Sequence, residues 1–68
     1  MNIKVIFDTD NAAFEENFDA EVRNIFSQAV RRVLEEYRVS DHGTYDYPLM
    51  DVNGNRVGTV EMDLGVED

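Results

Sequence analysis

The stretch TYDYPLMDVNGNRVGTVEMDL, residues 44–64, decides the fold of this chain. It holds an Asn-Gly dipeptide at positions 53–54 between two runs of alternating apolar and polar residues, which is the strongest short-range signal for a β-hairpin. Pairing the two runs across a two-residue loop at this dipeptide gathers the apolar side chains on one face. That face holds Tyr45, Tyr47, Leu49, Val60, Met62 and Leu64.

The length of the loop fixes the register of the hairpin. A two-residue loop sets Leu49 opposite Gly58 and Asp51 opposite Arg56, and a four-residue loop keeps the same register. A three-residue loop shifts every pair by one residue and brings acidic side chains onto the apolar face, so we predict the two-residue register. Pro48 has no backbone N–H to give to a sheet, and we therefore expect its strand at an edge.

A strand and an amphipathic helix precede the hairpin. Residues 2–8 alternate as a strand with one predominantly apolar face, and residues 22–37 carry apolar side chains at helical spacing. Asn17 or Asp19 can cap the N-terminus of the helix. We predict a single α+β domain, residues 1–68, with the order β-α-β-β. One helix packs its apolar stripe on a three-stranded, mostly antiparallel sheet, in which the first strand lies beside the last.

One helix can cover only one face of this sheet. Four apolar residues are expected to point from the opposite face: Ile6, Met50, Val52 and Val57. A partly apolar exposed face on a small domain indicates a self-interface or a partner's surface. Scattered exposed apolar residues are also ordinary in monomers, so the sequence leaves both interpretations open.

Acidic residues dominate the charge of the chain. Fifteen Asp and Glu oppose six Lys and Arg, for a formal net charge of −9. Residues 39–68 alone hold seven acids against one arginine, a balance of −6, whereas residues 19–38 are neutral. Such a field attracts basic protein surfaces and repels nucleic acid and anionic membranes, and it also serves solubility. We expect a cytoplasmic protein that makes no direct contact with nucleic acid or membrane.

The stretch VIFDTD, residues 5–10, ends an apolar strand with two aspartates and resembles the first motif of haloacid-dehalogenase-type phosphatases. In that family the first Asp is the nucleophile, the second is the general acid, and Mg²⁺, a lysine and further carboxylates are required. Here Lys4 lies within the same strand, and Asn11 follows Asp10 in place of the family's Gly-Thr. We therefore expect no enzyme activity, and we predict that Asp8 and Asp10 form an Asx-type turn.

Two further motifs bear on metal binding and acid–base chemistry. Asp51, Asn53 and Asn55 repeat the first three ligand positions of a calcium loop, but the glycine and glutamate that complete such a loop are absent. His42 lies beside Asp41 in a break before the hairpin, and no nucleophile accompanies it. We expect no metal site and no cofactor.

The motifs DTDNAAF at residues 8–14 and DVNGNRVG at residues 51–58, separated by one amphipathic helix, resemble a pattern in short accessory proteins of tailed phages. That group has no established activity. The resemblance therefore implies a setting, the cytoplasm of an infected bacterium, and no catalytic residues. A small acidic phage protein is also analogous, in class and charge but not in motif, to the anti-restriction and anti-CRISPR proteins that mimic DNA.

The sequence thus predicts a binding protein without catalytic activity. The leading hypothesis is that it binds and blocks a host protein with a basic surface, by presenting acids as a DNA mimic does. The acids expected to meet this partner are Asp8, Asp10, Asp41, Asp46, Asp51, Glu61 and Asp63, with further charge from Glu15, Glu16, Glu67 and Asp68. The alternative is a structural or assembly role, in which a homodimer forms through Ile6, Met50, Val52 and Val57.

Overall fold

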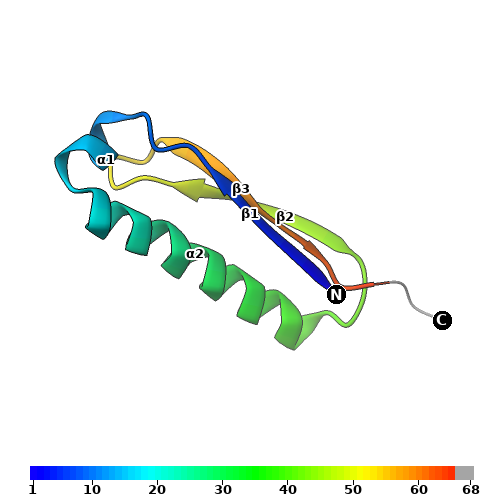
Figure 1. Ribbon diagram of the computed structural model, residues 1–68. Coiled ribbons are helices and arrows are strands. Elements are labelled where there is room, and N and C mark those ends of the chain that lie inside the picture. The colour runs from blue at the N-terminus through cyan, green and yellow to red at the C-terminus, as the bar shows by residue number, and fades with distance from the viewer. Residues whose placement is uncertain (66–68) are drawn as a thin grey trace.

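The computed structural model describes residues 1–65. Within them, the elements in chain order are β1 (Asn2–Phe7), α1 (Ala12–Glu16), α2 (Phe18–Val39), β2 (Thr44–Met50) and β3 (Arg56–Asp63). The strands form an antiparallel sheet in the order β1-β3-β2, and α2 lies along one face of it (Figure 1). The predicted α+β fold, the β-α-β-β order and the position of the first strand beside the last are confirmed.

The core lies between α2 and the sheet. Its fully buried large side chains come from both layers: Phe14, Ile25, Leu49, Val60 and Met62. Burial of each such side chain contributes about 1.5–3 kcal/mol relative to exposure. Tyr47 and Leu64 are half-buried and pack against this cluster. The apolar face predicted for the hairpin is therefore the face that meets the helix.

The hairpin has the predicted pairing along its strands but a different loop. Leu49 lies opposite Gly58, as predicted. The Asp51 N–H donates to the Asn55 carbonyl at 2.8 Å, so the loop contains three residues. Gly54 closes this loop with a φ of +82°, the left-handed conformation that a three-residue hairpin loop requires at its last position.

A β-bulge reconciles this loop with the predicted register. Met50 lies opposite Arg56, whereas the pairs further along the strands keep the predicted register, so Val57 is the extra residue of β3. The predicted pair between Asp51 and Arg56 is therefore wrong. A three-residue loop is compatible with an apolar hairpin face because the bulge restores the pairing just beyond the loop.

A short turn and α1 connect β1 to α2. The Asp10 N–H donates to Asp8 Oδ1 at 3.0 Å, which is the predicted Asx-type turn. Asn11 then caps α1 by accepting from the Phe14 N–H. Asn17 ends α1 and caps α2, so it is the one of the two predicted caps that the structure uses.

Helix α2 is rotated about its axis relative to its apolar stripe. Ile25 and Ala29 are buried, but four other members of the stripe are 46–63% exposed: Phe26, Val30, Leu34 and Tyr37. Conversely, Glu21 and Glu36 are buried. The prediction that the whole stripe packs against the sheet is therefore wrong for one flank of the helix.

Candidate binding surfaces

Polar contacts between α2 and the hairpin explain the rotation of the helix. Gln28 makes two hydrogen bonds with the backbone of Met50: its Nε2 donates to the carbonyl at 2.6 Å, and its Oε1 accepts from the N–H at 2.9 Å. Glu21 Oε1 accepts from the Val52 N–H at 3.1 Å. These contacts hold the polar flank of α2 against β2 and direct the opposite flank to solvent.

Glu36 makes an equivalent contact near the C-terminal end of α2. Its carboxylate accepts from the Tyr47 hydroxyl and from Ser40 Oγ, the latter at 2.8 Å. These two donors, Tyr47 first, hold the pKa of Glu36 below its ordinary value, and the bond to Glu36 raises the pKa of Tyr47. The Arg32 guanidinium lies over the Tyr47 ring, 4.8 Å from its centroid.

Sequence reasoning misses Glu21, Gln28 and Glu36 as contacts to the sheet. Their spacing of seven and eight residues places them on one line along the helix, beside Ile25 and Ala29. A glutamate at such a position is ordinarily exposed. The spacing therefore does not distinguish a buried hydrogen-bonding acid from a surface charge.

The substitution Tyr47→Phe tests the contact with Glu36. It removes the largest cause of the lowered pKa, so the pKa of Glu36 should rise toward its ordinary value of 4.5, as measured by NMR titration of the side-chain carboxyl group. A lowered pKa in the folded state stabilises the fold above the ordinary value, and that contribution disappears as the pH falls through the folded pKa. The variant should therefore lose less stability than the wild type below pH 4.5.

Tyr45→Phe is the matched control. The Tyr45 hydroxyl donates to the His42 carbonyl at 3.0 Å rather than to Glu36. Its removal should leave the pKa of Glu36 unchanged. An unchanged Glu36 pKa in Tyr47→Phe would contradict the assigned hydrogen bond.

Six of the seven acids predicted to meet a partner are exposed, and they lie in different parts of the molecule. They occupy the sheet face away from α2 (Asp46, Glu61, Asp63), the turn after β1 (Asp8, Asp10) and the break after α2 (Asp41). Glu67 and Asp68 lie outside the described residues. The structure therefore gathers three of the predicted acids on one strand-built surface, which we refer to as the acidic sheet face.

The acids outside the sheet interact with their sequence neighbours. Asp8 raises the pKa of Asp10, through a side-chain hydrogen bond first and charge repulsion second. His42 Nδ1 lies 2.7 Å from Asp41 Oδ1, and this hydrogen bond is the largest cause of the lowered pKa of Asp41. These are local pairs, and they do not extend the acidic sheet face.

Asp51 is not available to a partner, and its predicted place among the surface acids is wrong. Asp51 is buried, with 5% of its surface exposed. Its carboxylate accepts from the backbone N–H groups of Asn53 and Asn55 at 2.9 and 2.8 Å, and from Asn11 Nδ2 at 2.7 Å. Hydrogen bonding, above all from the Asn55 N–H, holds the pKa of Asp51 below its ordinary value. Asp51 thus joins the hairpin loop to the start of α1.

The four apolar residues predicted for self-association do not form one surface. Ile6 is exposed on β1, whereas Met50 and Val52 are exposed at the loop end of β2, and β3 separates these two strands. Val57 is half-buried and packs against the core cluster, so its predicted exposure is wrong. The bulge at Val57 explains the difference, because it interrupts the alternation of side chains along β3.

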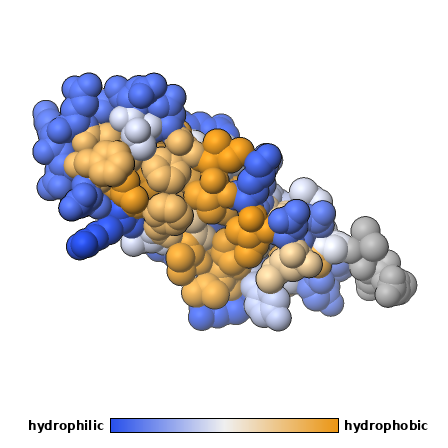
Figure 2. Space-filling view, viewed as in Figure 1, coloured by the Kyte–Doolittle hydropathy of each residue, from blue (hydrophilic) through white to orange (hydrophobic). Residues whose placement is uncertain are grey.

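Exposed apolar side chains gather instead along the outer flank of α2 and the adjoining strand β1. We refer to this surface as the α2–β1 face, and its members are Met1, Ile3, Phe26, Val30, Leu34 and Tyr37. The ring of Phe26 contacts that of Phe7 at a centroid distance of 5.6 Å, and Met1 and Tyr37 line one hollow. Figure 2 shows apolar surface continuing across this side of the molecule. Such continuity is typical of protein–protein contact surfaces.

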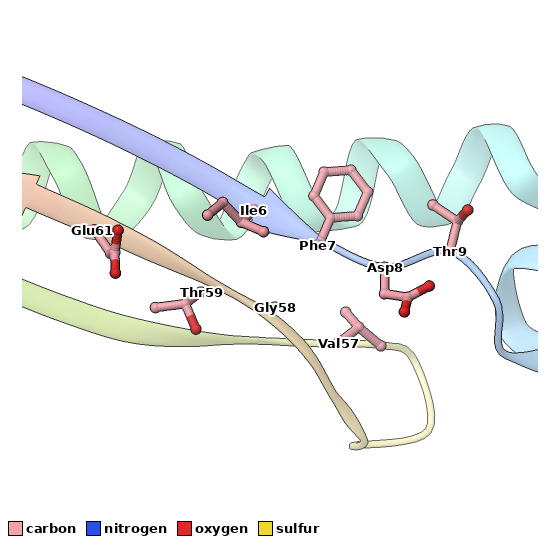
Figure 3. A pocket seen from close by; sticks show the side chains of 8 residues that line it. All are labelled: Ile6, Phe7, Asp8, Thr9, Val57, Gly58, Thr59 and Glu61. Carbon is pink, nitrogen blue, oxygen red and sulfur yellow. The ribbon is translucent and has the colours of Figure 1, made fainter.

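A shallow hollow lies where β1 ends beside β3 (Figure 3). Its lining includes the carboxylates of Asp8 and Glu61 and the hydroxyls of Thr9 and Thr59, but no histidine, lysine or arginine. Across residues 1–65, the structure places no group of three or more His, Asp or Glu side chains where they could hold a metal ion.

In the described part of the chain, neither helix has the length and apolarity needed to span a membrane. Comparisons with known protein families, with curated proteins and with solved structures find no match to this chain.

Proposed function

We propose that this chain is a binding protein that recognises a basic protein surface through the acidic sheet face. The observation that carries the proposal is that Asp46 lies directly opposite Glu61 on neighbouring strands. Like charges in this arrangement destabilise a sheet. A sequence that breaks a local rule of stability does so most often at a functional site.

The neighbours of this pair support the same function. Lys4 lies opposite Glu61 on the other side, so this row across the three strands holds one base and two acids, and Asp63 adds a third carboxylate further along β3. A host protein that binds nucleic acid offers the complementary basic surface, on which these carboxylates would take the place of phosphates. The proposed class is therefore a phage-type inhibitor that acts by charge mimicry and not by catalysis.

Two variants of equal net charge test this proposal in pull-downs from host lysate. The first removes the acids of the sheet face, by Asp46→Asn, Glu61→Gln and Asp63→Asn. The second removes three exposed acids from the helices, by Glu15→Gln, Glu16→Gln and Glu35→Gln. A partner captured by the wild type should be retained by the helix variant and reduced at least about tenfold by the sheet variant, because each lost contact costs affinity.

Salt provides the second measurement. The wild-type complex should dissociate as the salt concentration approaches about 1 M, where the screening length falls to about 3 Å. Equal capture by both variants would contradict the assignment to the sheet face. A partner held equally well at high salt would contradict recognition by charge.

A further inference from the structure

The two edges of the sheet are protected to different degrees. The β2 edge carries Pro48, and the backbone of Met50 is hydrogen-bonded by Gln28 from α2. The β1 edge has the sequence NIKVIF, with no proline and Lys4 as its single charged residue. A largely apolar edge strand without such protection is a template for pairing with another chain.

The hydrogen-bond pattern of β1 shows which backbone groups face the open edge. The Asp8 N–H donates to the Val57 carbonyl at 2.9 Å. In an antiparallel ladder, residues bonded to one neighbouring strand alternate with residues directed away from it. The even-numbered residues of β1 therefore turn their N–H and C=O groups to β3, and Ile3, Val5 and Phe7 turn theirs to the open edge.

Pairing β1 with the β1 of a second copy about Val5 satisfies these groups. Val5 then lies opposite Val5 of the copy, and Ile3 lies opposite Phe7 of the copy, so that all three residues exchange hydrogen bonds. On the other face, Lys4 lies opposite Ile6 of the copy. A two-fold axis at Lys4 would instead set two lysines opposite one another, which destabilises a sheet.

The area of the α2–β1 face is close to what a stable dimer needs. Its six members are between 41% and 70% exposed. At roughly 180 Å² for a large side chain, they offer on the order of 600 Å² per protomer. The backbone and side chains of the β1 edge add to this, and a standard protein–protein interface buries about 800 Å² per partner.

The charges of α2 favour an antiparallel copy of the same helix as its neighbour. Asp19 lies in the first turn and Arg38 in the last turn. A two-fold axis through Val5, perpendicular to the sheet, reverses the direction of α2 in the second copy. The acidic end of each helix then lies toward the basic end of the other, and the two helix dipoles oppose one another.

We propose that a second copy of this chain covers the α2–β1 face. The two β1 strands pair antiparallel about Val5, and the apolar flanks of the two α2 helices meet above them. The sheet then continues from one protomer into the other, with both helices on the same side. This proposal does not depend on the basic partner of the acidic sheet face, because that face lies on the other side of the sheet.

Sedimentation of two matched variants tests the dimer. The wild type should sediment as a dimer at about 100 μM, with a Kd of about 10 μM or lower. Val30→Glu places a charge on the α2–β1 face at a residue that is 55% exposed, and it should weaken dimerisation at least about 100-fold. Val52→Glu makes the same change in the hairpin loop, where the residue is 74% exposed, and should leave the dimer intact.

Hydrogen exchange of the wild type tests the strand pairing separately. The amides of Ile3, Val5 and Phe7 should exchange slowly in the dimer, because each then donates across the interface. A monomeric wild type would overturn the dimer, and equal dissociation by both glutamate variants would overturn its assignment to the α2–β1 face. Rapid exchange at these three amides in a dimeric sample would overturn the pairing of β1 with itself.

Discussion

The Gly58→Ala variant should lose most of the stability of this fold, because a methyl group at this position has no space. A Cβ atom built on Gly58 would lie 2.1 Å from the Ile6 carbonyl oxygen and 2.5 Å from Phe7 Cβ. Both atoms belong to β1, whose backbone cannot turn aside as a flexible side chain does. We expect a loss of at least about 3 kcal/mol, or a Tm lower by roughly 12 °C or more, in urea and thermal unfolding.

Thr59→Ala is the matched control for this substitution. Thr59 is the next residue of β3, and its Oγ1 accepts a hydrogen bond from Arg56 Nη2 at 2.8 Å on the exposed side of the molecule. Its removal should cost less than about 1 kcal/mol. A Gly58→Ala protein that unfolds at the same urea concentration as Thr59→Ala would contradict the close approach of β1 to β3.

The pairing of the two hairpin strands could be predicted because it depends on the alternation of apolar and polar residues along each strand. Tyr47, Leu49 and Val60 reach the core only in one register, and a slip of one residue would reverse the two faces of the hairpin. The edge position of β2 followed from the missing N–H of Pro48. Both arguments need only residues that are near one another in sequence or in the hairpin.

The rotation of α2 could not be predicted in the same way. It depends on the hydrogen bonds between Gln28 and the backbone of Met50, which are 22 residues apart in sequence. The apolar stripe of α2 predicts an inward-facing flank, whereas these contacts, with that of Glu36 to Tyr47, turn part of the stripe outward. The exposed face that results belongs to α2 and β1, and it is not the sheet face on which the sequence placed the exposed apolar residues.

The different roles of the acidic residues in the hairpin could not be predicted from the sequence either. Asp46 and Asp51 are both aspartates of the hairpin, and no local pattern separates them. In the structure Asp46 is exposed opposite Glu61, whereas Asp51 is buried and bonded to the loop. Asp51 accepts hydrogen bonds from the Asn53 and Asn55 N–H groups of its own loop, and also from Asn11 in a segment 40 residues earlier. The structural role of Asp51 thus depends on the fold of its loop and on the contact of that loop with Asn11.

Asp51→Ala should lower the Tm by roughly 10–15 °C, because three part-buried donors then lose their shared acceptor. The backbone N–H groups of Asn53 and Asn55 both donate to Asp51 Oδ1, and Asn11 Nδ2 donates to Oδ2. An alanine satisfies none of them. The hairpin loop and the start of α1 should therefore loosen together, which thermal unfolding at pH 7 and hydrogen exchange of the two loop amides will measure.

Asp46→Ala is the matched control, because it makes the same chemical change on an exposed residue of the same hairpin. It also relieves the repulsion from Glu61, so the Tm of this variant should be unchanged or slightly raised.

The pH dependence of the Tm tests the role of the Asp51 carboxylate further. The pKa of Asp51 lies below its ordinary value of 3.8, so the ionised carboxylate stabilises the fold above that pH and loses this effect as the pH falls through the folded pKa. The gap in Tm between the wild type and Asp51→Ala should therefore narrow as the pH is lowered below 3.8. An equal loss of Tm in Asp46→Ala, or a gap that does not change with pH, would contradict the structural role of the Asp51 carboxylate.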